Sequence, residues 1–539
     1  MRASRSGARR ERAGLLHLAG AGAAVAVAVA LFTRFGIDGT LSRDEAIYTY
    51  GGQRLAHGVP PYASIFDPKA PLATMLAGGA AAVARALGRD DLALIRGAFF
   101  VCACLTVLAV YLLAARLFRS QLAGLVAAVV FASFRGFAAD ALSGPDAKTP
   151  GILLLVVSMW LLTRRSWFWG AFAGSLAFLV WQPLLFYPAV ACLVAVLNGT
   201  PGRRAGALGR ALAGAALPVA ATVAYFAAVG ALHRLVEAAL LFPLTGIVRG
   251  HETVPARLAH IVSVVNGDYG FSAVLFWAGL VLLLLLVAVH VARHPDGLGP
   301  ALRDPLVCVV LLTLAAEVWY ASTDFQSFPD LYPLLAYPAL GLGGAVAAVV
   351  GALRRPALRA VGVAGALVAL GGLTVFSWGA FTRDPLNDHG LDAQRADACA
   401  LQRLVAPGNP LYSLGDPAPL ALTHRTNPDR FIFLGSGVDQ WKVAHLPGGF
   451  PAWTAQVRTS GAQVVVFQGW DRDALHQRMA SWLRGAGYHR SFVGGWRVFL
   501  THAARERALR EGVALTPYKT PVATGPTGRP FPAGGCQSR

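Results

Sequence analysis

The stretch Ser42–Leu72, SRDEAIYTYGGQRLAHGVPPYASIFDPKAPL, is the first long polar segment of the chain and follows an apolar run of membrane length. It begins with the adjacent carboxylates of Asp44 and Glu45, continues through an aromatic-rich segment, and ends in Asp67-Pro-Lys69. Most of the other long segments are apolar enough to lie in a membrane and to hold this loop at its surface. The fold is therefore expected to be built around this loop.

The composition is that of a polytopic membrane protein. Of the 539 residues, 55% are hydrophobic and 14% are charged, whereas soluble domains average about 25% charged residues. Because a spanning helix needs about 20 apolar residues, the apolar runs predict a mainly α-helical membrane protein with about eleven spans. The predicted spans are 14–34, 92–115, 120–139, 150–163, 167–182, 183–199, 211–231, 270–292, 304–321, 332–352 and 360–381.

The formal net charge of +19 does not indicate a nucleic-acid partner, because the arginines are grouped in short loops between apolar runs. This is the positive-inside pattern of membrane proteins. With its basic N-terminal segment, the chain is expected to be a multi-pass protein of the plasma membrane with a cytoplasmic N-terminus. The alternation of spans then places nearly all acidic residues of the membrane domain on the outer side, where they predict a functional surface.

Three regions are predicted. Residues 1–382 form the membrane domain, whose outer segments contain helices at 43–56 and 71–87 and two interfacial helices broken around residues 249–251. Residues 383–510 alternate strand-like runs (LYSLG, FIFLG, AQVVVFQG and WRVFLTH) with helical patterns at 391–405 and 471–486, which predicts a small extracytoplasmic α/β domain. Residues 511–539 are rich in Pro, Gly and Thr and predict a disordered tail. Cys399 and Cys536 are placed where a disulfide can form.

Asp44 and Glu45 are the candidate catalytic residues. Ser42-x-x-Glu45 matches a capping box, which gives Glu45 a purely structural alternative. Asp44 has no capping role, although it can simply favour the helix dipole in the first turn. A carboxylate there can also take the proton of an acceptor hydroxyl. The pair can instead hold a divalent cation such as Mg²⁺ or Mn²⁺, since hard cations bind carboxylate oxygens. The residues alone leave both chemistries open.

Lysine is rare in this chain, with four among 47 basic residues. The two in the membrane domain both occur in Asp-x-Lys-x-Pro, as Asp67-Pro-Lys69-Ala-Pro and Asp146-Ala-Lys148-Thr-Pro. A compact ammonium suits a phosphate oxygen, so these four residues are candidate substrate ligands. The alternative is an ordinary Asp/Lys pair at a helix start with Pro in its first turn.

Three further residues are candidate substrate contacts. Gln182, in Trp-Gln-Pro at the end of a span, can bind a sugar or a phosphate, although the proline also explains the break. Arg96 is either a snorkelling side chain or a contact to the donor phosphate. Tyr62 can stack on a sugar ring, although interfacial tyrosines are common without a ligand.

The order of these motifs resembles a known family. The chain has one span, then Asp-Glu at the start of a helix, then Gly-x-Pro-Pro-Tyr and Asp-x-Lys-x-Pro-Leu. This order is similar to that of the first outer loop of GT-C glycosyltransferases. The resemblance is to bacterial relatives, of actinobacterial type, of the protein-mannosyltransferase and lipid A aminoarabinose transferase group, and extends over residues 1–382. It implies a polyprenyl-phosphate sugar donor, inversion at the anomeric carbon and chemistry on the outer face. It also implies Asp44 or Glu45 as base, Lys69 near the lipid phosphate and Arg96 in support.

This chain departs from the family pattern where it reads GPDAKTP and WQP, which leaves the substrate undefined. The C-terminal domain resembles outer appendages of actinobacterial members and is expected to help bind the acceptor. The expected activity is therefore transfer of a hexosyl or pentosyl group to a cell-envelope glycan, lipid or protein. The alternative is a transporter or flippase of a lipid-linked glycan, which predicts internal repeats and broken helices at the membrane midplane. Neither is clear in the sequence.

Overall fold

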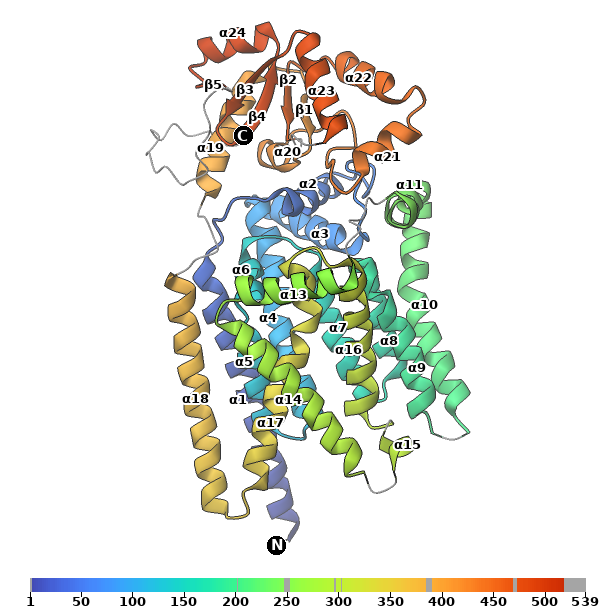
Figure 1. Ribbon diagram of the computed structural model, residues 1–539, viewed down its shortest axis with the longest axis vertical. Helices are drawn as coiled ribbons and strands as arrows, with labels where there is room; N and C mark the ends of the chain where they lie inside the picture. The colour runs from blue at the N-terminus through green and yellow to red at the C-terminus, as the bar shows by residue number, and fades with distance from the viewer. Residues whose placement is uncertain are drawn as a thin grey trace.

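The computed structural model describes residues 2–517 except 201, 247–252, 295–296, 302, 384–389 and 469–472. Long helices stand side by side as a bundle, and a small α/β domain covers the end of the bundle opposite the N-terminus (Figure 1). Within the described residues, six helices are long and apolar enough to cross a membrane. They are α1 (Arg2–Phe32), α4 (Asp91–Leu117), α10 (Arg204–Ala228), α14 (Ser272–Ala292), α16 (Pro305–Asp324) and α18 (Pro356–Arg383).

Two bent helix pairs raise this number to eight. They are α5 (Gln121–Ala132) with α6 (Arg135–Ser143), bent by 70°, and the 3₁₀ helix η4 (Phe328–Leu334) with α17 (Ala336–Ala352), bent by 43°. Three shorter apolar helices, α7 (Lys148–Thr163), α8 (Trp167–Val180) and α9 (Phe186–Asn198, preceded by η2, Gln182–Leu185), coincide with the remaining predicted runs. All eleven runs are thus helical, while a count of eleven spans stays a prediction.

The bend between α5 and α6 brings polar residues to the end of the bundle opposite the N-terminus. Ser133, at the bend, donates its hydroxyl proton to Val129 O at 2.8 Å, and this back-bonding favours a bent helix. The backbone N–H of Arg135 then donates to Ser272 Oγ at 3.2 Å rather than continuing the ladder of α5. As a result α6 crosses the end of the bundle, which carries Asp140 toward α2.

Close helix packing holds the bundle together. α4 packs against α3, α5 and α7, and α14 packs against α17. A Cβ at Gly341 would lie 1.9 Å from Gly279 O, so α14 and α17 can approach this closely only with glycine at that position. Small residues serve the same purpose in other membrane bundles, where the backbones must approach closely.

A layer of short helices covers the end of the bundle opposite the N-terminus (Figure 1). The predicted helices at 43–56 and 71–87 are confirmed as α2 (Arg43–Ala56) and α3 (Leu72–Leu87). Helical segments flank the predicted break near residue 250, which itself lies outside the described residues. These segments are α11 (Leu232–Val236), the π-helical η3 (Glu237–Leu241), α12 (Phe242–Thr245) and α13 (Val254–Asp268).

The C-terminal domain contains a five-stranded sheet of order β1-β2-β4-β3-β5, in which only the β1–β2 pairing is parallel. Its strands are β1 (Leu411–Leu414), β2 (Val464–Phe467), β3 (His489–Val493), β4 (Trp496–Leu500) and β5 (Thr516–Pro517). Its helices are α19 (Leu391–Leu404), α20 (Ala418–Thr423), α21 (Val438–His445), α22 (Gly449–Thr459), α23 (Ala474–Gly485) and α24 (His502–Arg510).

Three of the four predicted strand runs are confirmed as β1, β2 and β4. The run FIFLG is not a strand, because its backbone forms a hydrogen bond with a loop residue instead of a ladder with a neighbouring strand. Gly415 N donates to Ile432 O at 2.6 Å. The start assigned to the tail was also wrong, since β5 pairs with β3 beyond residue 510. Residues 518–539, which include Cys536, lie outside the described residues. Cys399 is disulfide-bonded.

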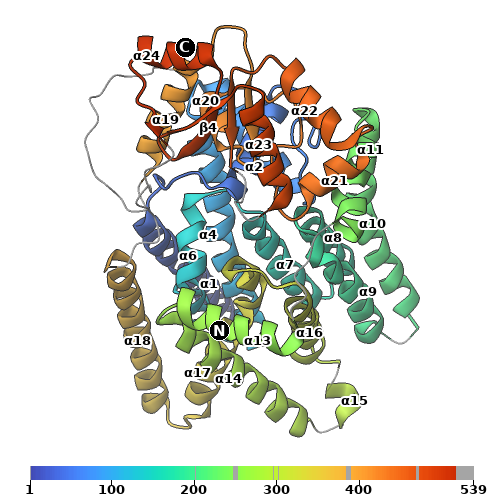
Figure 2. The ribbon, with the colours of Figure 1, turned by 45° about the horizontal axis from the view of Figure 1, so that its top comes forward.

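The C-terminal domain and the membrane domain share a hydrophobic core. One face of the sheet contributes Leu411 and Val464, and α2 contributes Ala46 and Tyr50 to the same buried cluster. Figure 2 shows this domain lying over α2. The helix that carries Asp44 and Glu45 is therefore fixed from both sides.

Candidate active site

The two carboxylates predicted to be catalytic lie in the first turn of α2. Ser42 Oγ accepts a hydrogen bond from Glu45 N at 3.3 Å, and Glu45 Oε2 accepts one from Ser42 N at 3.1 Å. This is the capping box that the sequence offered as one role for Glu45. Asp44 takes no part in the cap and is exposed. Of the two, Asp44 is the carboxylate that a substrate in solvent can reach directly.

Glu45 faces the loop that follows α6. The backbone of Gly144 lies so close to the Glu45 carboxyl group that a Cβ there would be 2.0 Å from Cδ. Burial and, to a smaller extent, the negative charge of Asp140 together raise the pKa of Glu45 to about 8, while Arg96 opposes the shift. Glu45 therefore holds its proton more strongly than an exposed glutamate, as an acid or base acting near neutral pH must.

The loop with Lys69 lies beside α2. Lys69 N donates to Asp67 Oδ1 at 3.0 Å, and Asp67 is buried. Burial raises the pKa of Asp67, while Lys69 opposes the shift. Burial lowers the pKa of Lys69, but the carboxylates of Asp44 and Asp67 more than offset this, so the net shift is upward and the ammonium stays charged. Its Nζ lies 5.1 Å from the ring centre of Tyr48.

Several predicted substrate contacts instead hold this loop in place. Gln182 accepts from Ala70 N at 3.1 Å and donates to Pro68 O at 2.7 Å. The Tyr62 side chain is buried, and its backbone has a φ of 66°. Its hydroxyl donates to Lys69 O at 2.8 Å. Arg96 donates to Ile37 O and Gly39 O below α2. These bonds give Gln182, Tyr62 and Arg96 positioning roles; direct contacts to a substrate stay predictions.

Lys148 repeats the local turn of Lys69 in different surroundings. Lys148 N donates to Asp146 Oδ1 at 2.6 Å. Unlike Lys69, its ammonium is paired with carboxylates, lying 3.3 Å from Asp330 and 3.9 Å from Asp146. Within the described residues no such ion pair is found for Lys69. Lys69 is therefore the cation better placed to receive an anionic ligand.

The structure adds two acidic residues that were not among the predicted site residues. Asp140 accepts a hydrogen bond from the Tyr332 hydroxyl at 2.6 Å, and Asp330 pairs with Lys148. The predicted topology places both on the outer side. The concentration of acidic residues on that side was the signal in the sequence that could have indicated them. Their contact with the site depends on the bends at α6 and η4, which the apolar runs did not show.

The C-terminal domain contacts the loop of Lys69 through the segment Asn427–Trp441. Phe66 N donates to Arg430 O at 2.6 Å, and the Phe66 ring stacks on Phe431 with centroids 4.8 Å apart. The Arg430 guanidinium pairs with Glu237 of the membrane domain at 2.7 Å. This docking segment therefore fixes the outer wall of the site, although its position was not evident in the sequence.

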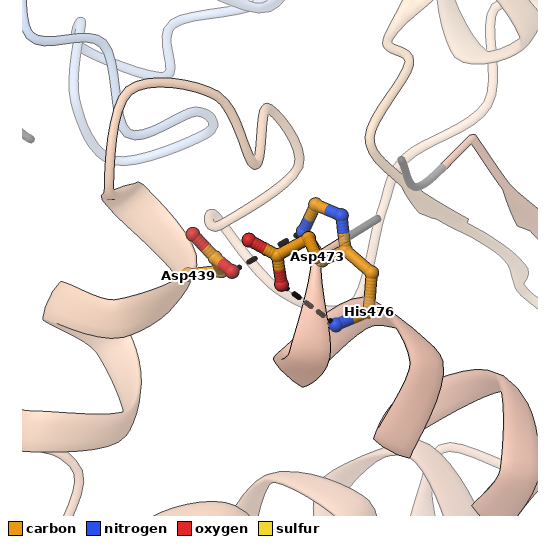
Figure 3. A group of neighbouring side chains, drawn as sticks. All are labelled: Asp439, Asp473 and His476. Carbon is orange, nitrogen blue, oxygen red and sulfur yellow. Dashed lines mark hydrogen bonds and ion pairs between the residues drawn. The ribbon is translucent and has the colours of Figure 1, made fainter. Parts of the chain in front are cut away.

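Within the described residues, one group of three metal-ligating side chains has all its ligand atoms within 4.8 Å of one another: Asp439, Asp473 and His476. It lies in the C-terminal domain, where α21 supplies Asp439 and the start of α23 supplies the other two residues (Figure 3). His476 Nε2 is 3.2 Å from Asp439 Oδ2, and Asp473 Oδ1 caps α23 by accepting from His476 N at 3.0 Å. The arrangement is that of a buried contact between His476 and Asp439 at a helix start. A cation at Asp44 and Glu45 stays a prediction.

The protein is a bundle of membrane-length helices, with carboxylates and lysines gathered beneath a smaller α/β domain. It therefore belongs to the class of polytopic membrane proteins with a polar site at one end. No protein-family model and no curated protein sequence matches the chain. Among solved structures, ArnT from Cupriavidus metallidurans in the apo state matches with a TM-score of 0.58 at 16% identity, over 89% of this chain and 97% of that one.

A second similar structure is the archaeal oligosaccharyltransferase AglB from Archaeoglobus fulgidus, solved with an inhibitory peptide and a dolichol-phosphate. It matches with a TM-score of 0.51 at 15% identity, over 94% of this chain and 75% of that one. ArnT has also been solved with undecaprenyl phosphate. The chain thus has the fold of these solved structures, which confirms the fold expected from the resemblance of the first outer loop to GT-C glycosyltransferases.

Proposed function

We propose that this protein transfers a hexosyl or pentosyl group from a polyprenyl-phosphate donor to a cell-envelope glycan, lipid or protein. The shared fold supports this, since the similar structures contain undecaprenyl phosphate and dolichol-phosphate. The observation that carries the proposal is the neighbourhood of Lys69 and Asp44. A charged ammonium without a carboxylate ion pair lies beside an exposed carboxylate, at the outer end of a membrane bundle.

In the proposed reaction the acceptor hydroxyl attacks the anomeric carbon from the face opposite the phosphate. A bond forms between the acceptor oxygen and this carbon, and the bond from the carbon to the phosphate oxygen breaks, which inverts the configuration. The hydroxyl proton passes to Asp44, or to Glu45, as general base. The polyprenyl phosphate leaves with the electron pair, and Lys69 stabilises its negative charge.

Further parts of the proposal concern placement. The N-terminus is cytoplasmic and the C-terminal domain extracytoplasmic, so the reaction occurs on the outer face of the plasma membrane. The C-terminal domain helps bind the acceptor, and its position over α2 supports this. A Mg²⁺ or Mn²⁺ ion, where the reaction uses one, would be held by Asp44 and Glu45 and would stabilise phosphate charge.

The test is transfer from a set of radiolabelled polyprenyl-phosphate sugars into membranes that contain the wild-type protein or Asp44→Asn. Asparagine keeps the size and removes the charge. Asp268→Asn is the matched control, because Asp268 is also an exposed acid of the outer layer. The proposal predicts transfer by the wild type and the control, with a loss of about 10²-fold or more in Asp44→Asn.

Normal transfer by Asp44→Asn would assign the base to Glu45, and the double variant would then be inactive. If neither the wild type nor any variant transfers a sugar from any donor, transferase activity is refuted. Movement of a lipid-linked glycan across reconstituted vesicles would then establish the flippase alternative.

A further inference from the structure

A cavity lies at the end of the bundle that carries the N-terminus, the end opposite α2 and α3 (Figure 1). Its volume is about 960 Å³, and it lies between the ends of α4, α14 and α17 and the start of α18. Leu286 and Val289 of α14 give it an apolar wall. The size suits part of a lipid or another small molecule.

The rim of this cavity is cationic. Arg119, Arg293 and Arg359 line it, while Asp304 is the one acidic residue among the described residues of the lining. The Asp304 carboxylate is already used, because Oδ1 caps α16 by accepting from Leu306 N at 2.9 Å and Oδ2 lies 3.6 Å from His290 Nε2. The guanidinium groups of Arg119 and Arg293 have no ion pair among the described residues. Guanidinium groups bind phosphate oxygens in bidentate fashion, so this excess of arginine favours a phosphate.

The cavity continues along α18 into a membrane-facing groove. A neighbouring hollow of about 520 Å³ shares Arg359 and Val363 with it and is lined further along by Ala364 and Leu367. Most side chains of α18 are exposed to the surroundings of the bundle rather than packed against it. One occupant therefore needs a phosphate for the arginines and long apolar chains for the groove.

We propose that this cavity binds the headgroup of an anionic phospholipid, with its acyl chains along α18. Basic pockets between helices at a membrane surface recognise such headgroups. The bound lipid would contact the start of α18 together with the ends of α14 and α17, which line the same cavity. Because the site is at the opposite end of the bundle from α2, its role is independent of the proposed transfer.

The chain offers a matched control. Arg119 and Arg165 are both non-glycine residues in the left-handed region, at φ 49° and 58°, each in the turn after a long apolar helix. Both turns lie at the same end of the bundle, but only Arg119 lines the cavity. Glycine suits this backbone conformation, so Arg119→Gly and Arg165→Gly each remove one arginine without straining the turn.

The experiment uses the purified full chain in detergent after removal of lipid. Thermal unfolding and native mass spectrometry are compared with phosphatidylglycerol, with phosphatidylcholine of the same acyl chains, and with inorganic phosphate. We expect phosphatidylglycerol to raise Tm more than phosphatidylcholine and to be retained about tenfold better. Arg119→Gly combined with Arg293→Gln should abolish this preference, and Arg165→Gly should keep it.

Equal responses to the two lipids in the wild type would overturn the proposal, as would an unchanged preference in the double variant. A Tm increase with inorganic phosphate as large as with phosphatidylglycerol would assign the site to a free phosphate instead. If the double variant does not fold, each single variant is compared by retained lipid, and equal retention by Arg119→Gly, Arg293→Gln and Arg165→Gly refutes the site.

Discussion

Replacing Gly144 by alanine should show whether sugar transfer depends on the position of the Glu45 carboxyl group, apart from the role of this residue in the helix cap. The new Cβ would lie 2.0 Å from Glu45 Cδ and 2.3 Å from Oε1, whereas ordinary contact begins at 3.4 Å. The carboxyl group must therefore move by about 1.4 Å. The capping bond from Ser42 N holds one of its oxygens, so the movement takes the carboxyl group away from Asp140 or breaks the cap.

A displacement of about 1 Å at a reacting group costs on the order of 10²-fold in rate. This corresponds to about 2.7 kcal/mol of transition-state stabilisation. We expect Gly144→Ala to lower sugar transfer by about this factor with little change in expression. The assay is the radiolabelled transfer described above, with Tm of the purified protein measured in parallel.

Gly79→Ala is the matched control, because a Cβ at this helical glycine meets nothing within 4 Å. It should keep full transfer. Full transfer by Gly144→Ala, with the protein folded, would refute the reasoning, since it would show that the position of the Glu45 carboxyl group does not matter. Loss of transfer together with a large fall in Tm would indicate damage to the fold, and Glu45→Gln would then decide the role of the residue.

Three further predictions follow from the same geometry. Lys69→Gln should reduce transfer by about 10²-fold at unchanged Tm, whereas Lys148→Gln should lower Tm by leaving Asp330 and Asp146 unpaired, at about 3 kcal/mol; equal effects of the two variants on transfer and Tm would contradict the assignment. Burial raises the pKa of Glu45 to about 8, so its carboxylate forms only as pH rises through this value. Transfer that needs Glu45 as base should therefore increase between about pH 6.5 and pH 9, and Glu45→Gln should lack this increase. A flat pH profile of transfer in the wild type would exclude Glu45 as the base. Phe431→Ala removes the ring stacked on Phe66, worth about 1 kcal/mol, and should lower transfer several-fold, while Phe450→Ala, a ring of the same domain that packs on Trp453 instead, should not; similar transfer by both would show that the docking segment does not hold the site.

The helices of the bundle and of the first outer loop could be predicted because their signals are local. Run length marks each apolar helix, and the capping box marks the start of α2. The bends within two predicted spans could not be read in this way. They depend on bonds between distant parts of the chain, such as Arg135 N to Ser272 Oγ. Asp140 and Asp330 reach the site through these bends, so they were predicted only as outer-side acids.

The place of the C-terminal domain was equally beyond the sequence. Its strand-like runs alternate with helical patterns and follow from residue type, but Arg430 and Phe431, just before and at the start of the predicted strand FIFLG, lie in no strand. Their backbone and rings are used by the loop of Lys69, across a long separation along the chain. A run of apolar residues next to proline and glycine predicts burial without naming the partner.

The two Asp-x-Lys-x-Pro motifs show where local prediction ends. Both form the same turn, in which the lysine N–H donates to the preceding aspartate. The shared motif cannot distinguish the two lysines, whereas their surroundings in the fold do. η4 supplies Asp330 to Lys148, which pairs its charge, while the loop from Tyr62 to Lys69 is held by Gln182 and leaves the Lys69 ammonium against a tyrosine ring. A paired lysine stabilises the fold, whereas a charged lysine without such a pair can bind phosphate. The difference in role therefore arises from tertiary structure, and Lys69 and Lys148 are each other's most informative control.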